Sequence, residues 1–109
     1  MAETVKLEIF IPESHVHFLR DELAKIGVGK IGNYDHCSSM SKVSGTWRPL
    51  PGSDPYQGEI GKLEHGEECR LEMNCVRDLV PVALEVVRRV HPYETPVVNI
   101  VPLLNHLFA

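Results

Sequence analysis

The feature of this sequence that most constrains its fold is the order in which two kinds of hydrophobic periodicity follow one another. Apolar and polar residues alternate from Val5 to Ile11 and again from Leu71 to Cys75, as expected of strands with one buried face. Each of these segments is followed by a helical stripe, whose apolar residues stand three or four positions apart. The stripes are Val16, Leu19, Leu23 and Ile26, then Leu79, Val82, Val86, Val87 and Val90. The chain therefore contains two strand–helix units.

Residues that commonly begin or end helices delimit both stripes. We expect Ser14 to cap the first helix and Gly27 to end it, Asp78 to cap the second, Pro81 to lie in its first turn, and His91-Pro92 to stop it. A last strand is expected from Val97 to Val101, before a short apolar tail.

The middle of the chain is rich in glycine and proline, which interrupt regular structure. We expect a second strand over Tyr34–Thr46, an exposed loop over Trp47–Gly58, a short return strand over Glu59–Glu64 and a polar turn over His65–Glu67. The main elements then run βαββαβ, the order of an α+β ferredoxin-like sandwich, with a loop-rich excursion between its second and third main strands. A chain of 109 residues is expected to form one domain, residues 1–109.

Charge and hydropathy exclude several classes of partner. Fifteen acidic and eleven basic residues give a net charge of −4, so neither nucleic acid nor a membrane surface is expected to bind. No apolar run approaches the roughly 20 residues of a membrane helix, and the first residues lack a signal-peptide pattern, which favours the cytoplasm. Phe10, Val97 and Val101 place apolar side chains on the sheet face away from the helices. Self-association would cover that face.

Several histidines and cysteines are candidate metal ligands. His36, Cys37, His65 and His91 offer the nitrogen and sulfur donors that a divalent metal such as zinc takes, although no pair has a diagnostic spacing. They would have to converge in the fold or across a subunit boundary. Otherwise His36 and His65 are surface loop residues. The three cysteines form no CxxC pair, so free thiols are expected, and Cys75 is expected to pack in the core.

Two other segments are candidate ligand-binding elements. In His91-Pro92-Tyr93-Glu94-Thr95-Pro96, two prolines fix a turn that holds an imidazole, a phenol and a carboxylate close together. The alternative is a helix stop in which Tyr93 packs and Glu94 pairs with a neighbouring base. Trp47 opens a loop with fixed turns and a second aromatic residue, Tyr56, that either contacts a partner or ligand or folds back on its own domain. We assign no catalytic residue.

The motifs in this middle region and in the His91 turn resemble a known family. They are Gly32-Asn33-Tyr34, His36-Cys37, Gly45-Thr46-Trp47, Pro49-Leu50, Pro55-Tyr56, Gly58-Glu59, Gly61-Lys62-Leu63-Glu64 and His91-Pro92-Tyr93-Glu94. Together they resemble the inserted middle domain of the YqfO family of dinuclear-metal-centre proteins, and the last motif also resembles CutA proteins. The resemblance implies a PII/CutA-like fold that assembles as a trimer, and it adds Tyr34 to the ligand-binding candidates.

The same resemblance limits what can be carried over. In that family the metal-binding, hydrolytic part lies in flanking regions that this sequence lacks, so the dinuclear site is not transferred and a hydrolase activity is not favoured. We expect a stand-alone version of the inserted module: an oligomer that binds a metal ion or small ligand in an intersubunit cleft near His91, Tyr93 and Glu94, with a possible protein partner at the Trp47 loop. The alternatives are a small enzyme acting in that cleft and a purely structural assembly domain.

Overall fold

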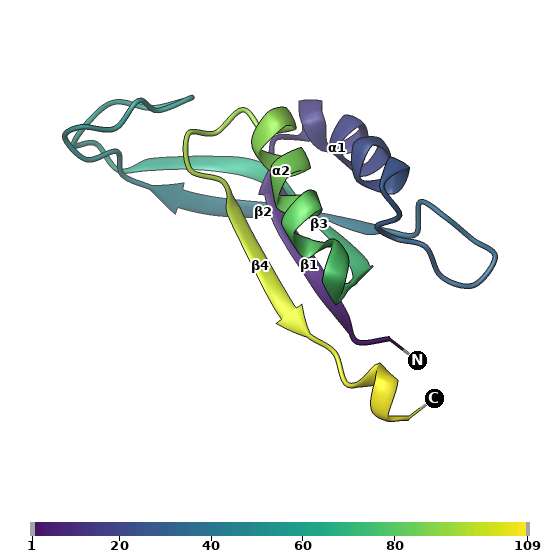
Figure 1. Ribbon diagram of the computed structural model, residues 1–109. Coiled ribbons are helices and arrows are strands. Elements are labelled where there is room, and N and C mark those ends of the chain that lie inside the picture. Colours follow the sequence, from purple (N-terminus) through teal and green to yellow (C-terminus); the bar gives the residue numbers. More distant parts are fainter. Residues whose placement is uncertain (1, 109) are drawn as a thin grey trace.

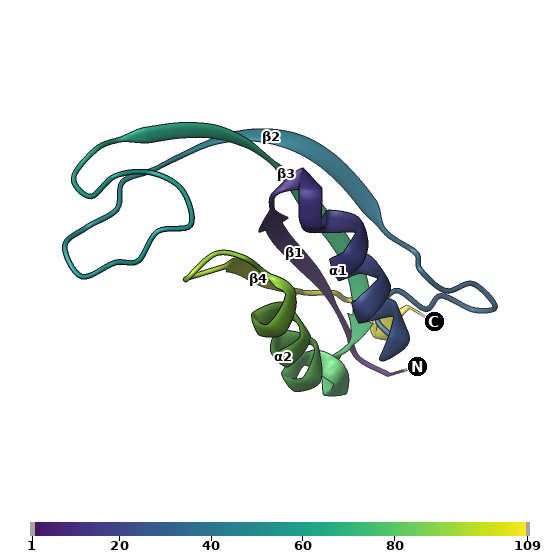
Figure 2. The same cartoon turned by 90° about the horizontal axis from the view of Figure 1, so that it is seen from above.

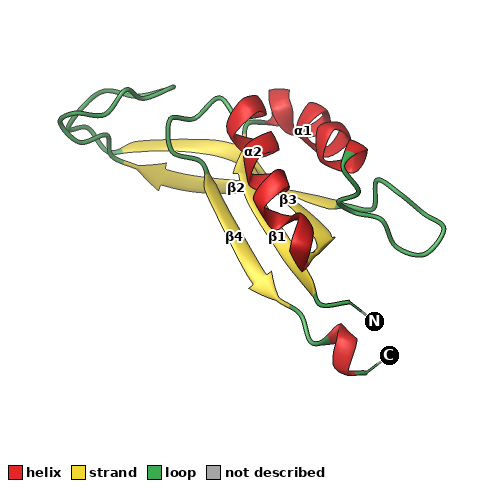
Figure 3. Cartoon of the chain, in the orientation of Figure 1, coloured by secondary structure: helices red, strands yellow, loops and turns green. Residues whose placement is uncertain are grey.

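Two helices cover one face of a four-stranded antiparallel sheet in the computed structural model, which describes residues 2–108 (Figures 1 and 3). The elements are β1 (Thr4–Ile11), α1 (Glu13–Lys25), β2 (Ser39–Trp47), β3 (Glu64–Val76), α2 (Val80–Val90) and β4 (Val97–Pro102), with 3₁₀ turns at Arg77–Leu79 and Asn105–Leu107. The strand order in the sheet is β2-β3-β1-β4. The predicted α+β ferredoxin-like fold is confirmed.

The core lies between the helices and the β1–β3 pair. Alternate residues of these strands point at the helices, and their side chains are fully or almost fully buried. The largest buried side chains are Leu7, Ile9, Ile11, Leu19, Leu23, Leu71 and Met73. Burying a side chain of this size contributes about 1.5–3 kcal/mol. Cys75 belongs to the same cluster, as its alternation with Leu71 and Met73 predicted, and burial raises the pKa of its thiol.

The helix ends agree only in part with the sequence prediction. The N-cap of α1 is Pro12 and that of α2 is Leu79, neither with a side-chain cap. The caps expected at Ser14 and Asp78 are therefore wrong. Ser14 lies inside α1, where its hydroxyl is 2.8 Å from His15 Nδ1, and Asp78 lies in the 3₁₀ turn that precedes α2.

The expected helix stops are found. Gly27 follows α1 with a φ of 99°, a conformation that side chains with a Cβ rarely adopt. α2 ends at Val90, and His91 is extended, as a residue before proline usually is. Pro81 lies in the first turn of α2, as predicted.

The middle of the chain departs most from the prediction. β2 begins at Ser39 rather than Tyr34, because residues 31–34 form a small turn closed by mutual backbone hydrogen bonds between Ile31 and Tyr34. The return strand expected over 59–64 is absent, because Gly58 and Gly61 take φ of 108° and 82°. The turn expected over 65–67 is also wrong, because these residues are already part of β3 and pair with Ser44–Thr46.

Part of the β2–β3 hairpin extends beyond the rest of the sheet. β1 pairs with β3 only as far as Ile11 opposite Cys69, whereas β2 and β3 continue to Trp47 opposite Glu64. We call residues 43–68, the distal hairpin with its connecting loop, the arm. Figure 2 shows the arm projecting past the helices. Pro49 is its one buried residue.

The sheet face away from the helices is mainly polar. Lys6 on β1 lies 2.9 Å from Glu72 and 3.3 Å from Glu8, and Arg70 also pairs with Glu72. Phe10, Val97 and Val101 share this face by register but do not form a continuous apolar surface over it. The expectation of an apolar face therefore holds only at its β4 side, where Val97 is 52% exposed. Neither helix of residues 2–108 is long and apolar enough to cross a membrane.

Candidate functional site

A cavity of about 430 Å³ lies where the arm meets the turn between α2 and β4. Both candidate ligand-binding segments contribute to its wall, although they are far apart in the sequence. The lining residues are Thr46, Trp47, Arg48, Pro49, Leu50, Ser53, Pro55, Tyr56, Gln57, Glu68, Tyr93, Glu94, Thr95 and Val97. We call it the Trp47–Tyr93 cavity.

Trp47 is fixed by the arm itself. Its indole Nε1 donates a hydrogen bond of 3.0 Å to the carbonyl oxygen of Gln57 across the loop. The indole ring lies against Gly66 of β3, where a Cβ would approach the ring to 3.0 Å. Gly58 gives similar clearance from the other side, since a Cβ there would lie 3.3 Å from Nε1. The absence of side chains at both positions lets the indole lie in the loop.

His91 links the turn between α2 and β4 to the end of β1. The residue is 7% exposed, and its Nε2 lies 2.6 Å from the carbonyl oxygen of Phe10 at the end of β1. Its Nδ1 accepts a hydrogen bond of 3.1 Å from the Tyr93 backbone N–H, so Nε2 carries the proton and donates to Phe10. Burial lowers the pKa of His91, which keeps the ring neutral. Both ring nitrogens are thus used structurally.

Tyr93 connects the turn to β3. Its hydroxyl donates a hydrogen bond of 2.9 Å to Glu68 Oε2, and its ring lies 5.8 Å from Tyr56 and 4.6 Å from His91. Burial, and then the hydrogen bond to Glu68, raises the pKa of the Tyr93 phenol far above its ordinary value. The phenol therefore stays protonated and acts as a donor to the carboxylate.

Glu94 connects the turn to the loop of the arm. Its Oε1 accepts a hydrogen bond of 3.0 Å from the backbone N–H of Asp54. The alternative predicted for Glu94, pairing with a neighbouring base, is not found among residues 2–108, because its partner is a backbone amide. Tyr93 and Glu94 together fasten the arm to the sandwich of helices and sheet.

The other ligand-binding candidate, Tyr34, lies elsewhere. It is 75% exposed in the loop after α1, at the end of the molecule opposite the arm loop (Figure 1). Three of the five candidates, Trp47, Tyr93 and Glu94, line the cavity, and His91 supports it from behind.

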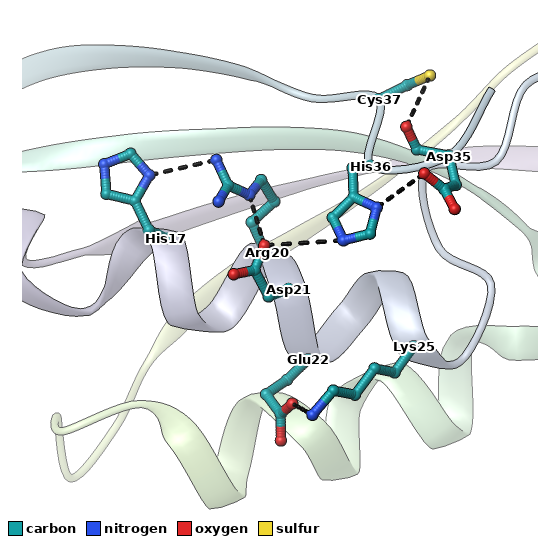
Figure 4. A network of polar contacts seen from close by, with 8 residues as sticks. All are labelled: His17, Arg20, Asp21, Glu22, Lys25, Asp35, His36 and Cys37. Atoms are coloured by element: carbon teal, nitrogen blue, oxygen red, sulfur yellow. Dashed lines mark hydrogen bonds and ion pairs between the residues drawn. The ribbon is translucent and has the colours of Figure 1, made fainter.

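The four metal-ligand candidates occupy three separate places. His36 and Cys37 lie in the loop after α1, where the imidazole is 2.9 Å from Asp35 and 3.8 Å from Asp21, and the Cys37 sulfur points toward the Asp35 carbonyl (Figure 4). His65 lies on the arm and His91 under the turn. Residues 2–108 contain no group of three or more His, Cys, Asp or Glu arranged to hold a metal ion. A metal site at these positions would need groups from two subunits.

Sequence reasoning missed Glu68. Glu68 is a residue of β3 that pairs with Val43 of β2, and its carboxylate accepts the hydrogen bond from the Tyr93 hydroxyl. The stretch Glu64–Glu68 contains no hydrophobic residue, so it shows no alternation of apolar and polar residues, and the sequence predicts a strand only after it. The partner of Tyr93 was therefore invisible until the hairpin register was known.

Comparisons with known proteins agree with this fold. No family model matches the chain. A Nostoc structure described as a PII-like protein CutA superimposes with a TM-score of 0.71 at 15% identity, covering 96% of this chain and 86% of that one. The likeness supports a CutA and PII-like ferredoxin-like architecture.

The sequence relatives are longer proteins. A protein named GTP cyclohydrolase 1 type 2 homolog from Halalkalibacterium halodurans is 36% identical over 100 residues, which are 92% of this chain and 27% of that protein. A Bacillus cereus structure described as related to NIF3 is 34% identical with a TM-score of 0.84, covering 95% of this chain and 26% of that one. The chain thus spans about a quarter of the length of these NIF3/YqfO homologues.

Proposed function

We propose that the chain is a small cytoplasmic binding or regulatory module that self-associates, as a trimer, and holds a small ligand in the Trp47–Tyr93 cavity. The observation that carries this proposal is the meeting of the Trp47 loop and the His91–Pro96 turn around one cavity, fastened by Glu68 and Glu94. Its volume lies within the roughly 300–1,000 Å³ range of small-molecule sites. We propose further that it corresponds to the inserted module of the NIF3/YqfO relatives.

The shape of the subunit supports self-association. A compact chain of this mass exposes about 6,100 Å², whereas this one exposes 7056 Å². The excess is on the order of the ~800 Å² that each partner buries in a standard interface. The radius of gyration, 15.2 Å, also exceeds the ~13 Å of a compact domain of this length. β2 and β4 form the two edges of the sheet, where another chain could pair.

The cavity favours binding over catalysis. Both ring nitrogens of His91 make hydrogen bonds to the backbone, so His91 offers no free base in this arrangement. The carboxylates of Glu68 and Glu94 are likewise engaged in positioning the turn and the loop. An enzyme acting in an intersubunit cleft remains the alternative, and turnover of a substrate would distinguish it.

Native mass spectrometry of protein purified without a histidine tag or chelator tests the proposal. A trimer is the expected result, and a retained small molecule or metal would appear as a mass excess on each subunit. A monomer at all concentrations would contradict self-association. Metal in stoichiometric amount that is lost in a His36→Ala and Cys37→Ala double variant would identify these residues as ligands, and metal carried by the trimer but not by the monomer would assign the site to the assembly.

A further inference from the structure

We propose that the Trp47–Tyr93 cavity takes a small organic cation, such as an alkylammonium group. This inference rests on the proposed function, because it names the ligand class of the same cavity. Its first support is the three aromatic rings in the wall, Trp47, Tyr56 and Tyr93. The faces of such rings attract cations, with tryptophan the most effective, and several rings around one space are the usual way to hold an ammonium group.

The charged groups of the wall give the second support. Among the lining residues there are two carboxylates, Glu68 and Glu94, and one cation, Arg48, whose side chain is exposed. Each carboxylate uses one oxygen to fasten the turn, Glu68 Oε2 with Tyr93 and Glu94 Oε1 with Asp54. Within residues 2–108, their second oxygens make no hydrogen bond or ion pair. A cation in the cavity would give these two oxygens a charged partner.

Several other glutamates of the molecule differ from Glu68 and Glu94 because they pair with basic side chains. Glu72 on the open sheet face holds Lys6 and Arg70, and Glu22 between the helices holds Lys25 and Arg89. Glu8 is likewise paired with Lys6, whereas Glu64 and Glu68, both partly buried in the arm, form no ion pair with a lysine or arginine of residues 2–108. Glu68, also partly buried, is matched only by a phenol. The cavity wall thus brings three aromatic rings and two carboxylates together, and neither carboxylate forms an ion pair with a lysine or arginine of residues 2–108.

The lining residues of the cavity argue against an anion and against a hard metal ion as the ligand. An anion would face the two carboxylates, and Arg48, which is exposed, is the one positively charged side chain of the lining. A hard metal ion takes six or more oxygen ligands at short distance, whereas much of this wall is aromatic and proline. An alkylammonium ion with an apolar part satisfies both the rings and the carboxylates.

Trp47 makes the test direct, because it is the single tryptophan of the chain. We would titrate the purified full chain with tetraethylammonium and with 1,5-diaminopentane, using sodium chloride at matched ionic strength and inorganic phosphate as comparisons. The readouts are the intrinsic fluorescence and the single indole N–H resonance. The expected result is a saturable change with either organic cation and none with sodium chloride or phosphate.

Three variants, each replacing one glutamate by the neutral glutamine, complete the experiment; two change the cavity wall and one is a control. Glu68→Gln and Glu94→Gln should each weaken cation binding about tenfold, the loss expected for a charge-assisted contact. Glu67→Gln, an adjacent residue outside the cavity wall, should leave it unchanged. Glu94 is exposed, so its variant keeps the test valid if Glu68→Gln unfolds.

The outcomes separate the ligand class from the proposed function. Saturable binding of phosphate but not of the cations would overturn the cation assignment and leave a ligand-binding module. Cation binding that is equal in all three variants, or no binding of either probe class, would also overturn the assignment. The proposed function fails separately, if native mass spectrometry finds only a monomer.

Discussion

The sandwich and the arm of this protein are built on opposite principles. In the sandwich, alternate residues of β1 and β3 are buried against two helices, and sixteen hydrophobic residues form one core cluster. In the arm, one face of the two-stranded ribbon is exposed and the other is only half-buried. Its order depends on backbone pairing, the Trp47 contacts and two hydrogen bonds to the Tyr93 turn. An isolated hairpin is marginally stable in water. The difference indicates that the sandwich supplies most of the stability, and the proposed function assigns recognition to the arm.

The largest expected effect is a loss of stability from a substitution in the core of the sandwich. Leu71→Ala removes a fully buried side chain of β3, so we expect a loss of about 2–5 kcal/mol in the free energy of unfolding. The matched arm variant is Leu50→Ala, whose side chain is 56% exposed, and there we expect a loss below about 0.5 kcal/mol. Urea denaturation followed by circular dichroism measures both. Equal losses would mean that the arm contributes to the core.

A second prediction concerns the joint between the two regions. Burial lowers the pKa of His91 in the folded state below 6.5, so the unfolded chain binds more protons in this pH range. The stability from neutral His91 is therefore present above pH 6.5 and is lost as the pH falls below it. Denaturant midpoints measured from pH 7.5 down to 5 should decline.

The control for this effect is His91→Gln, which cannot titrate. It should be less stable at pH 7.5, because the Phe10 carbonyl and the Tyr93 amide lose their partners, and its midpoints should fall less between pH 6.5 and 5. If the wild type and this variant decline in parallel, other groups cause the pH dependence.

The smallest expected effect lies inside the arm. A Cβ on Gly66 would come to 3.0 Å from the indole, so Gly66→Ala should displace Trp47 and lower stability by about 1 kcal/mol. At Gly45, on the paired strand, the nearest atom would be 3.7 Å away, so Gly45→Ala is the control. The tryptophan emission maximum should shift in the first variant only. A shift in both variants, or in neither, would contradict the packing of Trp47 on Gly66.

The contrast between the regions also explains what could be predicted from the sequence. The sandwich was predictable because Leu7, Leu71 and Val87 lie in patterns that one buried face imposes. The arm has no buried face, so His65 was assigned to a turn although it pairs with Thr46 in the hairpin. The chemistry of Trp47, Tyr93 and Glu94 marks them as ligand-binding candidates in the sequence. The contact between Glu68 and Tyr93, in contrast, depends on the register of the hairpin. The place of Tyr34, far from the cavity, was equally invisible.

The most direct test of the account is hydrogen exchange of the arm at two protein concentrations, one below and one above the association midpoint. If assembly orders the arm, the amides of residues 43–47 and 64–68 should become more protected at the higher concentration, while those of β1 stay equally protected at both. Arm protection that is the same in the monomer and in the assembly would contradict the proposal that the β2 edge of the sheet takes part in self-association.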